Sequence, residues 1–319
     1  MKRRQLIAST SLSLLPGLGW AQTGKPIRLI VPFPAGGPTD LVARVVAEPL
    51  GRLLGQPVIV DNKGGAGGSI GTAELARAQP DGLTFGIASV STHGVNPVVY
   101  KKLAYDPIKD FSPVCELCKA PVTLVVHPSI PVSNMAEFIA YLKKNPAKLA
   151  YGSPGNGSNN HMLAELFKSA TNTFMLHIPY RGTGPAMADL LSGQIQVYFD
   201  QVASSIAHIK SGKLRSLALS WHQRLDILPH VPTFAETSLF ANNNPSWFGL
   251  LAPAKTPETE IRRVHQAVIK SLAEPAVKER FAQLGLFASG GTPAELAALI
   301  QKEINTMSRV AKFAKISLD

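Results

Sequence analysis

The chain alternates short runs of apolar, β-branched residues with stretches in which apolar residues recur at helical spacing, and this alternation constrains the fold most. The first unit is an apolar run at residues 27–31, ended by Pro32, then a glycine-rich turn and a helix over residues 41–54. Because this order recurs, the sequence predicts an α/β fold with mostly parallel sheets. Ligands of such sheets bind at loops that follow the carboxyl ends of strands.

The remaining elements follow from the same patterns. Strands are expected at residues 58–60, 84–89, 121–127, 149–152, 175–179, 195–199, 216–220 and 248–252. Helices are expected at residues 70–78, 135–145, 161–169, 184–192 and 202–211, and over most of residues 257–316. Three polar, glycine-containing loops are candidates for a ligand site, at residues 33–40, 64–69 and 153–161. They are far apart in sequence, which favours two domains that face a common cleft.

Residues 1–21 have the features of an export signal. Three basic residues precede a short apolar stretch that is broken at Pro16, and Gly19 and Ala21 are small residues at the positions expected before a cleavage site. The apolar stretch is too short to span a membrane. We therefore expect a cleaved signal peptide, export by the Sec or the Tat route, and a mature protein in the periplasm.

The positive charge does not indicate nucleic-acid binding. The formal net charge is +11, and loss of the three basic residues of the signal lowers it to +8. The remaining basic residues are scattered in pairs, which is typical of a solvated surface, and aromatic residues make up only 7% of the chain. We expect no nucleic-acid partner.

Catalytic and metal-binding motifs are missing from the sequence. Ser153 lacks the glycine that a G-x-S-x-G motif needs, because Tyr151 stands in its place, and neither H-E-x-x-H nor a phosphate-binding glycine motif occurs. The eight histidines form no ligand cluster. We predict that the protein is not an enzyme and has no metal or cofactor.

Two glycine-rich loops offer hydrogen-bond donors for an anion. Ala35, Gly36 and Gly37 place successive backbone N–H groups before a helix, and Thr39 adds a hydroxyl. The loop from Ser153 to Asn160 is a second donor-rich segment before a helix. Uncharged donors suit a small carboxylate, but the same residues also serve as turns and helix caps without a ligand.

Cys115 and Cys118 form a C-x-x-C pair. In an exported protein such a pair can be a disulfide, a redox pair or two free thiols. If the segment is extended, residues three apart point to opposite faces, which favours structural thiols.

Six motifs in the same order resemble the Bug-type receptors, the periplasmic substrate-binding proteins of tripartite tricarboxylate transporters. They are VPFPAGGPTD at residues 31–40, VDNKGGAGG at 60–68, QPDG at 79–82, YGSPGNGS at 151–158, PYRG at 179–182 and LLSGQ at 190–194. The resemblance spans nearly the whole mature chain.

The resemblance implies a two-lobed periplasmic binding protein of type II, which closes on its ligand like a flytrap. It places lobe 1 at residues 23–125 and 222–319, lobe 2 at residues 126–221, and crossing strands at residues 121–128 and 215–221. One ligand carboxylate would contact the first loop, and lobe 2 would contribute the loop at residues 153–158. The ligand-binding residues that we predict are Phe33, Ala35, Gly36, Gly37, Thr39, Asp40, Thr92, His93, Ser153, Gly157, Ser158 and Asp200.

The implied function is capture of a small carboxylate, such as a dicarboxylate, an acidic amino acid or an aromatic acid, by a monomer that delivers it to the membrane subunits of the transporter. Two alternatives stay open. An exported sensor that presents its ligand to a signalling partner would have the same binding lobes. An exported hydrolase is disfavoured by the missing nucleophile motifs.

Overall fold

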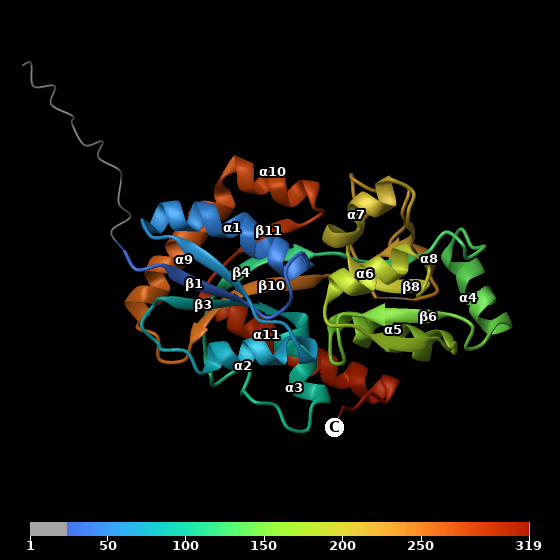
Figure 1. Cartoon of the computed structure of the whole chain (residues 1–319), viewed down its shortest axis with the longest axis horizontal. Helices are drawn as coiled ribbons and strands as arrows, with labels where there is room; N and C mark the ends of the chain where they lie inside the picture. Colours follow the sequence, from blue (N-terminus) through green and yellow to red (C-terminus); the bar gives the residue numbers. More distant parts are fainter. Residues whose placement is uncertain (1–23, 241, 319) are drawn as a thin grey trace, which may run out of the picture.

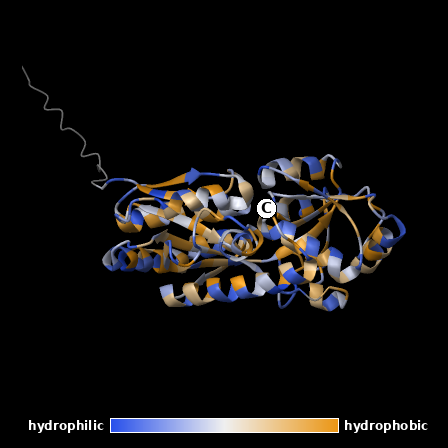
Figure 2. Ribbon diagram, turned by 90° about the horizontal axis from the view of Figure 1, so that it is seen from below, coloured by the Kyte–Doolittle hydropathy of each residue, from blue (hydrophilic) through white to orange (hydrophobic). Residues whose placement is uncertain are grey.

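The computed structural model describes residues 24–240 and 242–318, and the predicted signal peptide lies outside them. Two sheets, each covered by helices, form two lobes that lie side by side (Figure 1). In the view of Figure 2, apolar residues concentrate on the strands and on the helix faces turned toward them. No helix in the described part of the chain combines the length and apolar character needed to cross a bilayer.

The first lobe is built on a six-stranded sheet of order β11-β4-β10-β3-β1-β2. Its strands are β1 (Ile27–Val31), β2 (Val58–Asn62), β3 (Thr84–Ser89), β4 (Phe111–Ala120), β10 (Ser246–Pro253) and β11 (Phe287–Gly290). Its helices are α1 (Pro38–Leu54), α2 (Ser69–Ala76), α3 (Asn96–Val99), α9 (Glu258–Ala273), α10 (Pro275–Gln283) and α11 (Pro293–Ala314), with short turns at η1 (Ala66–Gly68) and η2 (Ser91–Val95).

The second lobe is built on a five-stranded sheet of order β7-β6-β8-β5-β9. Its strands are β5 (Val122–Val126), β6 (Ala150–Ser153), β7 (Leu176–Pro179), β8 (Val197–Gln201) and β9 (Arg215–Leu219). Its helices are α4 (Met135–Lys144), α5 (Asn159–Thr171), α6 (Thr183–Leu191), α7 (Val202–Lys210) and α8 (Phe234–Thr237).

Both sheets are mixed, so the prediction of mostly parallel sheets is wrong. β1 is parallel to β2 and β3, and β6 is parallel to β7 and β8. β10 is antiparallel to both of its neighbours, and so is β5. β10 and β5 are each the first strand that the chain forms after it crosses from the other lobe. A strand that enters the sheet from that side runs in the direction opposite to the strands of the βαβ units.

The first crossing between the lobes lies at the start of the implied crossing strand at residues 121–128, but the lobe boundaries differ from those that the resemblance implies. β4 belongs to the first sheet and β5 to the second, so the first crossing lies at Pro121 rather than after residue 125. After β9 the chain continues to pack on the second lobe, because Phe234 and Phe240 belong to its core. The return comes between Phe240 and β10, well beyond residue 221.

The two cysteines lie on one face of β4, contrary to the expectation of opposite faces. Their partners on β10 are Leu250 for Cys115 and Phe248 for Cys118, and a register shift between these pairs inserts one extra residue on β4. Both thiols are free and buried in the first lobe's core. Burial raises the pKa of Cys115 to about 12, and the pKa of Cys118 is also raised, so neither forms a reactive thiolate at neutral pH.

Candidate functional site

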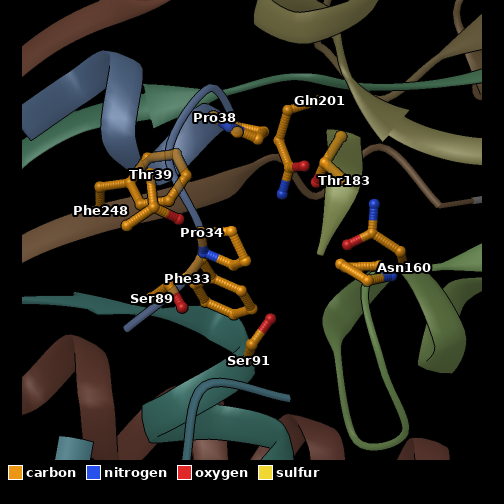
Figure 3. Close-up of a pocket in the computed structure, with 12 residues that line it drawn as sticks. Phe33, Pro34, Pro38, Thr39, Ser89, Ser91, Asn160, Thr183, Gln201 and Phe248 are labelled. Atoms are coloured by element: carbon orange, nitrogen blue, oxygen red, sulfur yellow. The ribbon is translucent and has the colours of Figure 1, made fainter. Parts of the chain in front are cut away.

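A cavity of about 360 Å³ lies between the two lobes (Figure 3). Residues of both lobes line it, and its wall combines aromatic rings, prolines and uncharged polar groups. The lining residues are Phe33, Pro34, Gly37, Pro38, Thr39, Ser89, Ser91, Pro154, Asn160, Thr183, Gln201 and Phe248. None of these carries a charge.

Four helices begin at the cavity wall. Thr39 lies in the first turn of α1, Asn160 in that of α5 and Thr183 in that of α6, and Gln201 precedes the first residue of α7. In the described part of the chain, the N-cap residues of α1, α6 and α7 form no side-chain capping hydrogen bond, although the first N–H of α7, that of Val202, donates to the carbonyl of Pro121 at 2.9 Å. Because the first amides of a helix lack intrahelical acceptors and carry a partial positive charge, this arrangement favours an anion without any basic side chain.

The first loop divides into residues that face the cavity and residues that hold the loop in place. Gly37 and Thr39 line the cavity, whereas Ala35 and Gly36 are exposed. The N–H of Gly36 is not a free donor, because it donates to Oδ2 of Asp40 at 2.9 Å. We predicted Ala35, Gly36 and Asp40 as ligand-binding residues, but none of them lies on the cavity wall.

Asp40 connects three segments of the first lobe. Besides Gly36, its carboxylate accepts hydrogen bonds from Nε of Arg44 at 2.8 Å and from Nδ2 of Asn62 at 3.0 Å, and Asn62 also donates to the carbonyl of Phe33. Burial alone would raise the pKa of Asp40, but the hydrogen bonds from Arg44, Gly36 and Asn62 outweigh it and lower the pKa. The Asp40 carboxylate thus stabilises the loop at residues 33–40 without lining the cavity.

We expect Asp40→Asn to lower the free energy of unfolding by about 1–3 kcal/mol at pH 7, the usual cost of removing a charge-assisted hydrogen bond. A carboxyl with a lowered folded pKa stabilises the protein above its unfolded pKa, and this stability is lost as pH falls through the folded value. The variant should therefore lose stability less steeply below about pH 4 than the natural protein does. Urea unfolding at several pH values measures both effects, with the exposed Asp226→Asn as control.

In the loop from Ser153 to Asn160, some residues serve as a helix cap or a turn, as the sequence also allowed. Ser158 is the N-cap of α5 and accepts a hydrogen bond from the N–H of His161 at 3.3 Å. Gly157 has φ +75°, a conformation that glycine adopts without strain. Neither residue nor Ser153 lines the cavity, but Pro154 and Asn160 of the same loop do.

Ser153 and His177 form a hydrogen-bonded pair that resembles part of a catalytic dyad. Oγ of Ser153 lies 2.7 Å from Nε2 of His177. Ser153 is completely buried and also accepts from the N–H of Gly155. The ring of His177 is stacked between those of Tyr151 and His161. A nucleophile must reach its substrate, so this pair shapes the loop rather than supplying hydrolase chemistry.

Thr92 and His93 lie in the buried interior of the first lobe rather than on the cavity wall. Oγ1 of Thr92 bonds to Nδ1 of His93 at 2.9 Å, and the imidazole packs against the ring of Phe111. Burial lowers the pKa of His93 to about 3, so the ring is neutral at neutral pH. Both residues support the turn that begins at Ser91, which does line the cavity.

Asp200 lies one residue before Gln201, beside the cavity but not on its wall. Oδ2 accepts hydrogen bonds from Ser204 at 2.5 Å and Ser205 at 2.6 Å, while Oδ1 has no hydrogen-bond partner among the described residues. Burial raises the pKa of Asp200 to about 6, although the two serine hydroxyls and the backbone of Gln201 act against it.

Sequence reasoning missed several lining residues, among them Ser89, Thr183 and Gln201. Each stands where a strand ends or a helix begins, at the end of β3, at the start of α6 and at the end of β8. The rule that ligands bind at the carboxyl ends of strands points to these positions. Applying it to every predicted strand, and not only to the glycine-rich loops, would have found them.

The two lobes touch each other around the cavity. The hydroxyl of Tyr100 in the first lobe donates to the carbonyl of Asn156 in the second at 2.9 Å. The N–H of Asn159 donates to Oγ of Ser91 at 3.0 Å. These hydrogen bonds define a closed arrangement.

A family model described as the tripartite tricarboxylate transporter family receptor matches residues 42–316. The solved structure of the periplasmic binding protein BugD is 34% identical, with a TM-score of 0.89, over 92% of this chain and 98% of BugD.

Two solved structures contain ligands. Rpa4515 of R. palustris with adipate is 33% identical, with a TM-score of 0.89, over 92% of this chain and 99% of that one. MatC from Rhodopseudomonas palustris with bound malate is 33% identical, with a TM-score of 0.87, over 90% of this chain and 99% of that one. These likenesses confirm the predicted two-lobed fold of a periplasmic binding protein. The chain belongs to the Bug-type receptors of the tripartite tricarboxylate transporter family.

Proposed function

We propose that the protein captures a small carboxylate in the periplasm and presents it to the membrane subunits of a tripartite tricarboxylate transporter. The observation that carries this proposal is the convergence of four helix N-termini on one closed cavity whose lining residues are uncharged. The first-turn amides of α1 and α6, whose N-cap side chains form no capping hydrogen bond, would bind a carboxylate by hydrogen bonds and by the helix dipole.

A dicarboxylate fits this cavity best among the carboxylates that the sequence suggested. Both lobes supply polar groups to the cavity, the hydroxyl of Thr39 on the first lobe and the side chains of Thr183 and Asn160 on the second (Figure 3). A ligand with a carboxylate at each end would use both walls and join the lobes. Adipate and malate, the ligands of the two related structures, are dicarboxylates.

The structure offers no particular support for the two alternatives. Ser153 of the Ser153–His177 pair is buried and does not line the cavity, so this pair does not favour a hydrolase. A sensor would bind its ligand in the same cavity, and we retain the transport role because of the family.

Calorimetric titration with a panel of C4 to C6 dicarboxylates tests the proposal, with the corresponding diamides as uncharged controls. We expect at least one dicarboxylate to bind with about micromolar affinity, and its diamide at least about 100-fold more weakly, because it lacks the charge that the helix termini favour. Equal binding of acid and diamide, or binding of sugars alone, would contradict the proposal.

A pair of glycine variants connects the binding to this cavity. A Cβ at Gly37 would lie 3.6 Å from Oγ1 of Thr183 on the other lobe, so the longer side chain of Gly37→Val should collide with it. We expect this variant to bind the dicarboxylate at least about tenfold more weakly, a cost typical of overpacking. Gly184→Val is the matched control, because a Cβ at Gly184 meets no atom within 4 Å. Similar affinities of the two variants would place the ligand elsewhere.

A further inference from the structure

A second cavity, of about 410 Å³, lies at the junction between the lobes. It is formed where α5 of the second lobe packs against α11 of the first, close to the segment in which the chain returns to β10. We call it the hinge cavity and define it by Met162 and Leu163 of α5 and by Glu303 and Met307 of α11.

The hinge cavity is distinct from the cavity between the lobes. The two have no lining residue in common. At two places, neighbouring residues line different cavities. Val90 lines the hinge cavity, whereas Ser89 and Ser91 line the cavity between the lobes. Asn159 lines the hinge cavity, whereas Asn160 lines the cavity between the lobes.

The hinge cavity has a charged lining residue, whereas the cavity between the lobes is lined by uncharged residues. Glu303 is the one charged residue among its described lining residues, and it lies beside the apolar side chains of Met162, Leu163 and Met307, which are almost fully buried. Methionine side chains are flexible and adapt to apolar ligands of different shape. Uncharged polar residues complete part of the lining, namely Asn159, Asn242, Asn244 and Thr306. A carboxylate beside apolar side chains favours a ligand that has a positive charge and a short apolar tail.

The Glu303 carboxylate has capacity for a further hydrogen bond. Its Oε2 accepts the indole N–H of Trp247 at 3.0 Å, and an ionised carboxylate has about four acceptor positions. The nearby Lys119 forms an ion pair with Glu116 at 2.7 Å, and Lys302 lies on the exposed side of α11. Burial raises the pKa of Glu303, although the Trp247 hydrogen bond and these two lysines act in the opposite direction.

We propose that the hinge cavity is a second ligand site, selective for a small organic ammonium ion with a short apolar tail. The ammonium group would donate to the Glu303 carboxylate, and the tail would lie against Met162 and Met307. The cation would offset part of the cost of removing the half-buried carboxylate from water.

Methionine methyl NMR tests this inference without any carboxylate ligand, so its result is independent of the proposed transport function. Met162 and Met307 report on the hinge cavity, and Met135, Met175 and Met187, which lie in other parts of the second lobe, are internal controls. The probes are n-butylammonium and 1-butanol, which have the same number of heavy atoms and differ in charge.

We expect n-butylammonium to shift the Met162 and Met307 signals saturably and to bind at least about fivefold more tightly than 1-butanol, the value of one modest charge-assisted contact. Glu303→Gln keeps an acceptor for Trp247 and should abolish this preference, whereas Glu279→Gln, an exposed change on α10, should retain it. Val310→Phe, which fills the cavity without changing its charge, should remove both shifts.

Three results would overturn the proposal. They are the absence of shifts at Met162 and Met307, equal shifts at all five methionines, and equal affinity for the two probes in the natural protein. Retention of the preference in folded Glu303→Gln would do the same. If that variant does not fold, retention of the shifts in Val310→Phe decides against the site.

Discussion

Gly67→Ala is expected to weaken dicarboxylate binding by about 10- to 100-fold, because the new methyl group would oppose closure of the lobes. A Cβ at Gly67 would lie 2.4 Å from the carbonyl oxygen of Asn156 and 3.2 Å from the carbonyl carbon of Gly157, both in the other lobe. The atoms that the new methyl group would contact belong to the backbone and not to a flexible side chain, so the lobes must separate to remove the steric overlap. If closure traps the ligand, separation costs affinity.

Gly212→Ala is a matched control for this effect. Gly67 has φ +60° and Gly212 has φ +72°. Alanine in this left-handed region should therefore lower the free energy of unfolding of both variants by a similar amount, about 1 kcal/mol. A Cβ at Gly212 meets no atom within 4 Å. The two variants should therefore be similarly stable and differ in binding.

Calorimetry measures the affinities, and small-angle X-ray scattering measures the compaction on ligand addition. We expect the Gly212→Ala protein to become more compact with ligand and the Gly67→Ala protein to remain more open. If Gly67→Ala binds and closes like Gly212→Ala, the contact with Asn156 is not part of the ligand-bound state.

The regular βαβ units could be predicted from the sequence in detail. β1 and β3 begin and end at the predicted residues, because each is a continuous buried run that the flanking residues terminate sharply. The start of α11 also follows from local sequence, since the Thr292 side chain caps the helix and Pro293 occupies its first position.

β4 could not be predicted, for a physical reason. Pro113, Glu116 and Lys119 interrupt its apolar residues every third position, whereas an ordinary strand alternates every second. Two register shifts against β10 produce this spacing, since each inserts a residue that breaks the alternation. A period of three is close to that of a helix, so the pattern is ambiguous in the sequence alone.

Two of the three loops that the sequence indicates line the cavity, with Phe33, Gly37 and Thr39 from the first and Pro154 and Asn160 from the loop at residues 153–161. No residue of the loop at 64–69 lines it. Asp40 is a buried residue that holds the loop, a role that its side-chain partners from distant segments determine. Such long-range partners leave no local pattern in the sequence.

Gln201→Glu is expected to weaken dicarboxylate binding by about 100-fold at pH 7. Gln201 is buried, lines the cavity and precedes the first residue of α7. The substitution keeps the size of the side chain and adds a negative charge. At about 5 Å from a ligand carboxylate, and with an effective dielectric constant near 20, the repulsion is about 3 kcal/mol.

The pH dependence separates this repulsion from a general structural effect. A buried glutamate has a raised pKa, so it takes up a proton as the pH falls toward about 5, and the repulsion then disappears. Binding by Gln201→Glu should therefore recover at low pH relative to the natural protein. Gln223→Glu, at an exposed position, adds the same charge and should bind normally throughout.

Calorimetric titrations of the three proteins at pH 5 and pH 7.5 provide the measurement. If Gln201→Glu binds a dicarboxylate as well as Gln223→Glu does at pH 7.5, the ligand's carboxylate does not lie near α7. If the loss at position 201 is the same at both pH values, it reflects altered packing of the cavity wall. Recovery at low pH in this variant alone would show that the helix N-termini at this cavity hold an anion, since only an anion is repelled by a charge that a proton removes.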